Sequence, residues 1–578
     1  MQPRLPEIVI VGGGPAGLIT AIELGRRGVP VIVLESDPGP PQFPRANATT
    51  SRTMEHYRRL GFADAIRARG LPEDYPQDVA YFTRLTGREL ARLPGRSRRQ
   101  AMAAREPADS RWPTPEPLHR GNQMYIEAVL MSQAMKYPAI DLRLGWRGEQ
   151  VARTEDHVRV AARELATGRE EMLEARYVVG CDGPRSIVRS AMGGRYEGVA
   201  DEDREFMGGR MMAVFFRSPD FYRVATAARS WQYWVVNPER RATIVAVDGE
   251  ALFVMHVQLP RGGRADRELA AQCLAQAMGR DFASEILGTE EWTAGFTLVA
   301  DRYVDDPLGP RLFLAGDAAH LFTPTGGQGY NTAVDDAVNL GWKLAAVQRG
   351  WGGTALLASY EAERRPIGIR NTSFARAMAE SIGRTRIPPQ LEEDSPEGAR
   401  SRQELGTSLA EHARTEFDIP GIHLGVCYRD SPVVCADPAP SPPDNWHRYV
   451  PSGYPGARAP HAWTADHGSL YDRFGPDFTL LRIGTQAADR GGKELDRGGN
   501  ELADRGGTAL ADPSGNVLAD AAAGLGVPLA TLDIDVPGLR ELYGACLVLV
   551  RPDQHVAWRG DDPPADAAAV IRTVTGQP

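Results

Sequence analysis

The chain has 578 residues, of which 42% are hydrophobic and 24% charged, an ordinary globular composition that excludes a largely disordered protein. At roughly 150 residues per domain, this length indicates three to four domains. The formal net charge of −9 argues against nucleic-acid binding through a basic patch, and the five scattered cysteines favour neither a disulfide framework nor a zinc site. No apolar run reaches the roughly 20 residues of a membrane helix, and the first apolar stretch leads into glycines rather than a signal-peptide cleavage site, so we expect a cytoplasmic protein without a membrane span.

A dinucleotide-binding fingerprint lies near the start of the chain. Residues 7–11 read EIVIV, a run typical of a strand buried on both faces of a parallel sheet. The glycine-rich turn GGGPAG, a helical pattern and a second apolar strand follow, and that strand ends at Glu35. Strand, GxGxxG, helix, strand and acid within about 30 residues are the full context of a dinucleotide site. Glu35 is then placed to accept hydrogen bonds from the ribose hydroxyls of an adenosine.

Each position of this turn has a physical role. Gly12 permits the tight turn, Gly14 lets backbone N–H groups approach a pyrophosphate, and Gly17 lets the helix and the strand pack closely. Pro15 and Ala16 start the helix, whose N-terminus favours negative charge. The fingerprint does not separate NAD from FAD, and a glycine turn that merely packs is the alternative.

Two later segments also combine a short strand with a polar turn. Residues 177–183 read YVVGCDG, in which an apolar strand ends at Asp182. Residues 311–317 read RLFLAGD and end at Asp317. A glycine-rich loop follows, and then a helix from about residue 330 to 347, whose apolar positions are spaced by three and four. A glycine loop that leads into a helix N-terminus can stabilise an anionic ring edge.

Together these segments resemble the class A FAD-dependent aromatic hydroxylases. The resemblance covers nearly the whole chain and is carried by GGGPAG, CDGPRS and AGDAAHLFTPTGGQGYN, in this order. It implies an α/β fold with a Rossmann-like FAD-binding domain, a substrate domain with an antiparallel β-sheet, and a C-terminal thioredoxin-like domain. We expect the FAD-binding domain at residues 1–185 and 299–380, the substrate domain at 186–298, a helical connector at 381–420 and the thioredoxin-like domain at 421–578.

The resemblance also implies cofactor-binding residues. Asp182 would sit near the pyrophosphate and take part in nicotinamide-nucleotide handling, and Asp317 would bind the ribityl or pyrophosphate region of FAD. Arg45 and Gln123 match a family arginine and glutamine close to the cofactor, although a solvated or capping role is the alternative for both. The flavin ring would be lined by Pro324 and the backbone of residues 325–331, among them Gly327, Gly329, Tyr330 and Asn331.

The family chemistry uses FAD, NADH or NADPH as a transient reductant, and dioxygen. Reduced nicotinamide gives hydride to FAD, dioxygen adds to the reduced flavin to form a hydroperoxide, and its terminal oxygen attacks an electron-rich ring. We therefore expect an FAD-dependent monooxygenase that hydroxylates a phenolic or polyketide-type aromatic substrate. The alternatives are Baeyer–Villiger oxidation of a polycyclic ketone on the same scaffold, and a non-catalytic flavin-binding scaffold that stabilises a partner.

The predicted substrate wall lies in residues 207–260, where short β-rich runs are separated by turn residues. Such a sheet could line an apolar pocket over the flavin. The candidates for this wall are Met211, Phe215, Tyr233, Trp234, Phe253 and His256, with a purely core role as the alternative. The candidate catalytic residues are Arg45, Asn47, Tyr233, His256 and Pro324.

Asn47 departs from the pattern of the phenol hydroxylases. These relatives carry an aspartate two residues after the arginine, which is thought to help deprotonate the phenol, and the aligned residue here is Asn47. An amide is no base at neutral pH. The proton would then pass to His256 or Tyr233, to water, or the substrate would already be partly ionised.

The tail reads as a separate unit with buried strands at FTLLRI and CLVLVRP. It lacks CxxC, so we expect a structural or oligomerisation role and a homo-oligomer, a dimer or larger. Within the tail, DRGG recurs at Asp489, Asp496 and Asp504, and this charged, glycine-rich stretch predicts a surface insertion.

Overall fold

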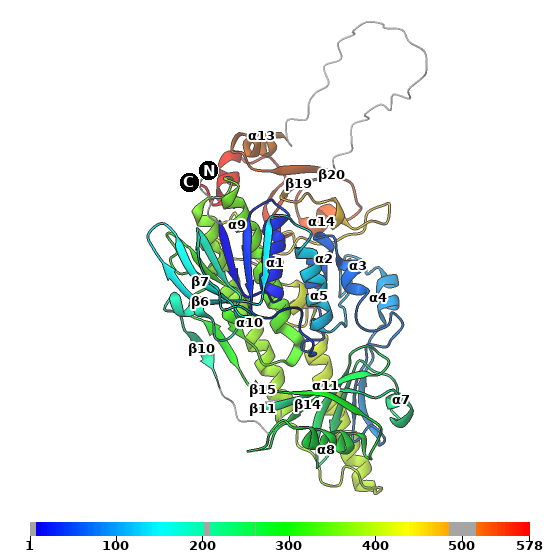
Figure 1. Ribbon diagram of the computed structural model, residues 1–578. Coiled ribbons are helices and arrows are strands. Elements are labelled where there is room, and N and C mark those ends of the chain that lie inside the picture. Colours follow the sequence, from blue (N-terminus) through cyan, green and yellow to red (C-terminus); the bar gives the residue numbers. More distant parts are fainter. Residues whose placement is uncertain (1–6, 201–207, 261, 485–515) are drawn as a thin grey trace, which may run out of the picture.

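The computed structural model describes residues 7–200, 208–260, 262–484 and 516–578. The three DRGG copies lie outside the described residues. Figure 1 shows the described chain as two β-sheet layers joined by long helices, with the C-terminal unit at the opposite end from the larger sheet. Within the described ranges, no helix has the length and apolar character that a membrane crossing requires.

A five-stranded parallel sheet organises the first part of the chain. Its order is β17-β9-β1-β2-β5, and each neighbouring pair runs parallel. The strands are β1 (Ile8–Val11), β2 (Val31–Glu35), β5 (Ile140–Leu144), β9 (Tyr177–Gly180) and β17 (Leu312–Leu314). Strands β1, β9 and β17 are buried along their whole length, as their continuous apolar runs require. The loops after β1, β9 and β17 therefore meet at one edge of the sheet.

Helices pack against one face of this sheet, and a small meander packs against the other. The helices are α1 (Pro15–Gly25), α2 (Ser51–Arg59), α3 (Ala63–Arg67), α5 (Gln123–Ala134) and α9 (Gln328–Gln348). The meander consists of β6 (Trp146–Arg153), β7 (Val158–Glu164) and β8 (Glu170–Ala175). Its apolar side chains share one core with β1, β2 and β9.

A seven-stranded sheet forms the second layer. Its order is β15-β11-β14-β13-β12-β3-β4, antiparallel except for the parallel pair β12–β3. The strands are β3 (Val79–Phe82), β4 (Glu89–Leu93), β11 (Gly209–Arg217), β12 (Gln232–Val236), β13 (Arg241–Ala246), β14 (Leu252–Gln258) and β15 (Glu285–Ala294). The sequence placed this sheet within residues 186–298, and two strands come from outside that range. A pairing between β3 and β12, which are about 150 residues apart, leaves no local turn signal in the sequence.

Short elements connect and flank the two layers. A three-stranded sheet of β10 (Tyr196–Val199), β16 (Thr297–Ala300) and β18 (His320–Leu321) lies where the chain crosses between them. The short helices are α4 (Arg98–Ala104), α6 (Ile187–Ala191), α7 (Phe221–Val224), α8 (Arg267–Met278) and α12 (Pro420–Leu424).

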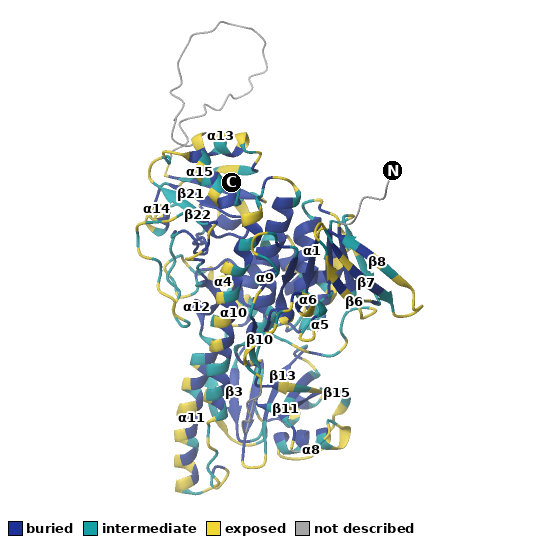
Figure 2. Cartoon of the chain, turned by 90° about the vertical axis from the view of Figure 1, so that its left-hand side faces the viewer, coloured by how far each residue is buried: buried dark blue, intermediate teal, exposed yellow. Residues whose placement is uncertain are grey.

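Two long helices follow, α10 (Thr354–Gly383) and α11 (Pro396–Phe417). In Figure 2, α11 runs along the larger sheet and shows a buried and an exposed side.

The C-terminal unit contains a four-stranded sheet in the order β20-β19-β21-β22. Its strands are β19 (Phe478–Ile483), β20 (Leu529–Ile534), β21 (Leu547–Val550) and β22 (Val556–Gly560), and its helices are α13 (Asn516–Gly524), α14 (Leu539–Tyr543) and α15 (Ala567–Thr575). Trp342 and Trp351 pack around Phe478 in one apolar cluster. The unit therefore shares a core with α9 and the turn that follows it.

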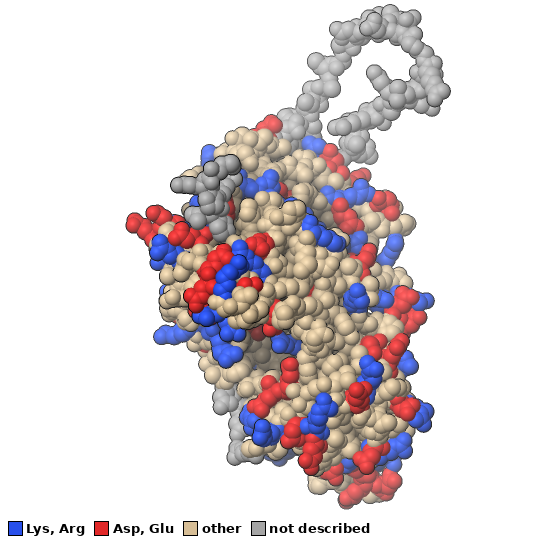
Figure 3. Space-filling view, viewed as in Figure 1, with Lys and Arg blue, Asp and Glu red and all other residues tan. Residues whose placement is uncertain are grey.

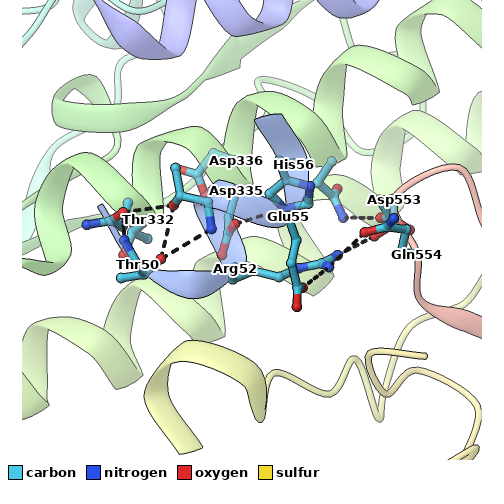
Figure 4. Close-up of polar contacts among 12 residues, drawn as sticks. Thr50, Arg52, Glu55, His56, Thr332, Asp335, Asp336, Asp553 and Gln554 are labelled. Atoms are coloured by element: carbon cyan, nitrogen blue, oxygen red, sulfur yellow. Dashed lines mark hydrogen bonds and ion pairs between the residues drawn. The ribbon is translucent and has the colours of Figure 1, made fainter. Parts of the chain in front are cut away.

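Buried charges join the same unit to α2 (Figure 4). Arg52 donates to Glu55 at 2.9 Å and to the Gln554 side chain at 3.0 Å. Arg458 donates to Glu55 at 2.9 Å. Glu55 is fully buried, and Arg458 and the guanidinium of Arg52 hold its pKa at about 2 despite that burial. Breaking a buried pair leaves an uncompensated charge, so this contact fixes the orientation of the C-terminal unit.

Candidate active site

A cavity of about 1280 Å³ lies between the edge of the parallel sheet and the seven-stranded sheet. Sites for a single small molecule usually measure about 300–1000 Å³, so this cavity is large enough for more than one ligand. Two sets of residues form its opposite sides. We call them the strand-end wall, made of Gly12, Gly14, Glu35, Asp182, Asp317 and residues 324–330, and the sheet wall, made of Ala213, Trp234, Thr243, His256 and Glu290.

The glycine turn of the strand-end wall depends on the absence of side chains. Gly12 has φ +103°, and a Cβ there would lie 2.2 Å from the Cys181 carbonyl oxygen. A Cβ on Gly17 would lie 2.0 Å from the Gly12 carbonyl oxygen, so Gly17 serves the packing of α1 against β1 and does not line the cavity. Around Gly14 the described residues leave open space toward the cavity. Pro15 and Ala16, the first residues of α1, also line it.

Glu35 is fixed beside this turn by backbone groups. Its Oε2 accepts from the Gly13 N–H at 2.6 Å, and its Oε1 accepts from the Asp37 N–H at 2.8 Å. A carboxylate has about four acceptor positions, so free lone pairs remain for ligand hydroxyls.

Two carboxylates at the ends of β9 and β17 face the cavity. Asp182 Oδ2 accepts from the Ile187 N–H at 2.7 Å, whereas its Oδ1 is buried and finds no hydrogen-bond partner in the described part of the chain. Asp317 is exposed and lines the cavity, where the surrounding protein still desolvates its carboxyl group. Desolvation raises the pKa of both carboxyl groups. A buried acceptor without a partner fits a ligand rich in hydroxyl donors, such as the ribityl chain of FAD.

The glycine-rich loop brings a helix N-terminus to the same wall. Pro324, Gly327, Gly329 and Tyr330 line the cavity, and α9 starts directly after Gly327, which has φ +65°. No side chain of the described residues caps this helix, so its first N–H groups can serve a ligand.

Asn331 does not line the cavity, contrary to the expectation for this loop. It is buried, where it accepts from the Thr50 N–H at 2.8 Å and donates to the Ala48 carbonyl at 2.9 Å. Because the helical turn points its side chain away from the cavity, Asn331 positions the segment that carries Arg45 and Asn47.

Arg45, Asn47 and Gln123 meet on one side of the cavity. Gln123 starts α5, and its backbone N–H donates to the Ala46 carbonyl at 2.7 Å. Its side chain donates to Glu127 at 2.6 Å. Three residues that the sequence separates by up to 78 positions are thus brought together.

The sheet wall is a single row across the strands. Trp234 pairs with Thr243, Thr243 with His256, His256 with Ala213, and Ala213 with Glu290. Directly paired residues point to the same face of a sheet, and all five line the cavity.

Tyr233 and Phe253 lie on the opposite face, so their prediction as pocket residues is wrong. The Tyr233 hydroxyl accepts from the Ser230 N–H at 2.8 Å, and the ring packs with Phe82 and Phe221. Phe253 stacks on Phe221 with ring centroids 4.0 Å apart. A shift of one residue along a strand exchanges the two faces of the sheet, and the sequence alone does not show which alternate residues face the cavity. Met211 and Phe215 share the face of Ala213 without lining the cavity.

His256 is a neutral group in this wall. Desolvation lowers its pKa to about 4, and its Nδ1 has no hydrogen-bond partner among the residues described. The Trp292 ring meets it edge-on with centroids 5.7 Å apart. At pH 7 His256 can therefore exchange hydrogen bonds with a ligand, but it is a weak base.

Several lining residues were missed from the sequence. Trp231 and Arg120 line the cavity, as do Phe417 and His423, which lie at or just after the predicted connector. The connector is therefore also part of the site. Phe417 meets Trp231 edge-on at 5.9 Å, a contact between α11 and the start of β12. No local pattern marks such residues, because they reach the cavity only through tertiary packing.

Comparison with known proteins identifies the family of the chain. A family model described as an FAD binding domain matches residues 6–375, and another, described as the C-terminal part of aromatic-ring hydroxylases, matches residues 497–578. The chain is an FAD-dependent aromatic-ring hydroxylase. The FAD-dependent monooxygenase apdD of Emericella nidulans is 32% identical to this hydroxylase over 593 residues, 96% of this chain and 87% of that protein. Aklavinone 12-hydroxylase RdmE of Streptomyces purpurascens is 32% identical over 600 residues, 99% of each chain.

A solved structure also resembles the hydroxylase along its whole length. RebC soaked with chromopyrrolic acid, with bound 7-carboxy-K252c, superposes with a TM-score of 0.83 at 33% identity and full coverage of both chains. The FAD of the hydroxylase supplies the redox and oxygen chemistry, and the protein supplies binding, orientation and shielding from water.

Proposed function

We propose that this hydroxylase binds FAD along the strand-end wall and hydroxylates a phenolic or polyketide-type aromatic ring held against the sheet wall. The observation that carries the proposal is one continuous cavity lined by both walls. It lets a ring on the sheet wall approach a flavin ring at residues 324–330 without solvent between them.

The strand-end wall offers a group suited to each part of FAD. The Gly12–Gly14 turn and Glu35 would hold the adenosine and pyrophosphate, and Asp182 and Asp317 would accept from ribityl hydroxyls or water at the pyrophosphate. The unpartnered Asp182 Oδ1 supports this placement, since FAD would satisfy it. Arg45 and Gln123 would contact the cofactor from the side of the cavity that they share with Asn47.

The sheet wall favours a flat, electron-rich substrate. Trp234 and Trp292 offer aromatic faces and edges, and Thr243 and His256 offer hydrogen bonds to ring hydroxyls. Relatives named for phenol and for aklavinone hydroxylation support a phenolic or polyketide-type substrate. NADH or NADPH would reduce the flavin.

The site offers no strong base among the residues that the sequence singled out. Asn47 is an amide, Tyr233 faces away, and His256 has a pKa of about 4. The substrate hydroxyl would therefore lose its proton to water or to Glu290 of the sheet wall, or enter already ionised.

The test combines binding and product analysis. The purified protein should retain FAD, and phenols should accelerate its NADH or NADPH oxidation. With ¹⁸O-labelled dioxygen, one labelled oxygen should appear as a ring hydroxyl. Label in an ester or lactone would instead mean Baeyer–Villiger oxidation, and no stimulation by any aromatic compound would leave a flavin-binding scaffold.

We also propose that the C-terminal unit is thioredoxin-like and structural. The strand order β20-β19-β21-β22, with a parallel first pair and antiparallel neighbours after it, supports this assignment. The shared core with α9 supports a structural role, and the lack of CxxC argues against redox chemistry.

A further inference from the structure

Arg120 places a cation in the cavity without a partner of opposite charge. Its side chain lines the cavity, and its guanidinium lies 3.4 Å from the centre of the Trp231 ring. The Nε atom is buried without a hydrogen-bond partner, and no ion pair joins this guanidinium to any residue that the structure describes. Arg120 is half-buried, and charges withdrawn from water in proteins are otherwise paired or hydrogen-bonded, so this one requires an explanation.

The surroundings of Arg120 are aromatic or neutral. Trp231 covers one face of the guanidinium, and Phe417 packs against Trp231. His423 is close enough for the charge of Arg120 to act on it, and burial together with that charge lowers the pKa of His423 to about 3, so this imidazole is neutral. Desolvation lowers the pKa of Arg120 itself to about 9, with no carboxylate near enough to oppose the shift. The group is still a cation at pH 7.

Three of the acidic residues that line the cavity already have partners within the protein. Glu416 accepts from the Gly326 N–H at 2.9 Å, Glu291 pairs with Arg210 at 2.6 Å, and Glu127 accepts from Gln123 at 2.6 Å. The other carboxylates of the cavity, Glu290 and Asp317 among them, are too far from Arg120 to raise its pKa, so its counter-charge is expected from a ligand.

The backbone around Arg120 holds the side chain in place. The Arg120 carbonyl accepts from the Leu71 N–H at 3.2 Å, and the preceding His119 exchanges two backbone hydrogen bonds with Thr49, each 2.9 Å long. The contact with Trp231 fixes the other end, at the start of β12 and next to the sheet wall. A guanidinium fixed in this way offers a planar fork of N–H donors, which suits a carboxylate.

We propose that Arg120 binds a carboxylate on the aromatic substrate and thereby selects acidic substrates over neutral ones. This inference rests on the proposed function, because it assigns the substrate to the side of the cavity where Trp231 and the sheet wall lie. It names a substrate class, an aromatic hydroxy acid, that neither the glycine motifs nor the sheet wall specify.

The test compares matched pairs of ligands on the FAD-loaded protein. Salicylate and methyl salicylate, and 1-hydroxy-2-naphthoate and its methyl ester, differ by one methyl group that removes the negative charge of the carboxylate. Dissociation constants are read from the change in flavin absorbance on titration. We expect at least one acid to bind about 10- to 100-fold more tightly than its ester, as a charge-assisted hydrogen bond implies. Arg120→Met should reduce this ratio to about one, and Arg120→Lys should retain part of it.

Arg229→Met is the matched control. Arg229 also lies over an aromatic ring, Tyr222, at 4.4 Å, but it is exposed and outside the cavity. It should keep the acid-to-ester ratio and the turnover of the wild type.

Two results would overturn the inference. If no acid binds more tightly than its ester, or if Arg120→Met leaves the ratio unchanged, Arg120 does not recognise a carboxylate. If Arg120→Met instead loses FAD while the wild-type ratio is one, the residue serves the cofactor. A wild-type protein that no aromatic compound stimulates, acidic or neutral, would contradict the proposed function separately, since the binding ratio is measured without turnover.

Discussion

The two walls of the cavity are built on different principles. The strand-end wall consists of backbone N–H groups, glycines and carboxylates that follow directly after strands, and each comes from a short continuous motif. The sheet wall takes one side chain from each of five strands that span residues 213–290. A cofactor shared by many proteins can be held by backbone geometry, whereas a substrate is held by side chains that can change without disturbing the fold.

Gly12→Ala should have the largest effect, because it changes the strand-end wall, which depends on close backbone contacts. A Cβ at this position would lie 2.2 Å from the Cys181 carbonyl oxygen, and the residue has φ +103°. Neither group can move without separating β1 from β9. We therefore expect the free energy of unfolding to fall by about 3 kcal/mol or more, and bound FAD to be lost. The flavin-to-protein ratio and thermal unfolding measure both.

Gly28→Ala is the control for Gly12→Ala. Gly28 also has positive φ, +72°, but a Cβ there would have open space among the described residues. The substitution should lower the free energy of unfolding by only about 1 kcal/mol, because alanine is strained in this left-handed backbone conformation, and the protein should keep its FAD. If both variants retained FAD equally, the strand-end wall would not depend on close backbone approach.

Trp234→Phe should have the next largest effect, on the wall made of side chains. The smaller ring keeps the packing on Tyr81 but loses contact area in the cavity. We expect the substrate dissociation constant to rise about tenfold, within the range of aromatic contacts, while FAD content stays the same. Titration of the flavin absorbance with a substrate that stimulates NADH or NADPH oxidation measures it.

Tyr233→Phe tests which face of β12 lines the cavity. It removes only a hydroxyl that faces away from the cavity and accepts from the Ser230 N–H. We expect a stability loss of about 1 kcal/mol and unchanged substrate affinity. An affinity loss equal to that of Trp234→Phe would mean that β12 presents the other face to the cavity.

These pairs also mark what the sequence could predict. Strands β1, β9 and β17 and the acids after them follow from local patterns, since an apolar run, a glycine turn and a carboxylate are adjacent in the chain. The sheet wall was predicted only in outline: of the residues proposed for it, Trp234 and His256 line the cavity, whereas Tyr233 and Phe253 face away from it. Alternation alone leaves two choices of face, and only the pairing with neighbouring strands decides between them.

Residues that enter the cavity through tertiary packing left no signal at all. Arg120 precedes α5 by three positions, and Phe417 ends α11, yet both reach the start of β12. A charged side chain in a loop is usually solvated, so only the structure shows that this one is enclosed.

His256→Gln should have a smaller, pH-dependent effect. The folded-state pKa of His256, about 4, lies below the ordinary value of 6.5, so the folded protein binds fewer protons at this site than the unfolded chain. Stability from this group is complete above about pH 6.5 and falls as the pH drops toward 4. We expect the variant to lose less stability than the wild type between pH 7 and pH 5. Parallel unfolding curves would show that His256 is not desolvated.

Asn47→Asp should have the smallest effect. It should change how steeply turnover depends on the pKa of the phenol, without a loss of activity. Asn47 lines the cavity, and no hydrogen bond from the described residues holds its side chain. Without a strong base beside the substrate hydroxyl, wild-type turnover should rise across a series of phenols as their pKa falls, until lower ring nucleophilicity offsets the gain. A well-placed general base raises the rate about 10²–10⁴-fold. The aspartate of the variant would have no neighbour among the described residues to orient it, so it should supply only a small part of this increase. It should raise turnover most for the least acidic phenols and so flatten the dependence of turnover on phenol pKa. Single-turnover oxidation of the reduced enzyme with dioxygen measures the slope for both proteins. A wild-type rate independent of phenol pKa, together with a steep loss in His256→Gln, would move the role of base from water to His256 and give the sheet wall a part in the chemistry.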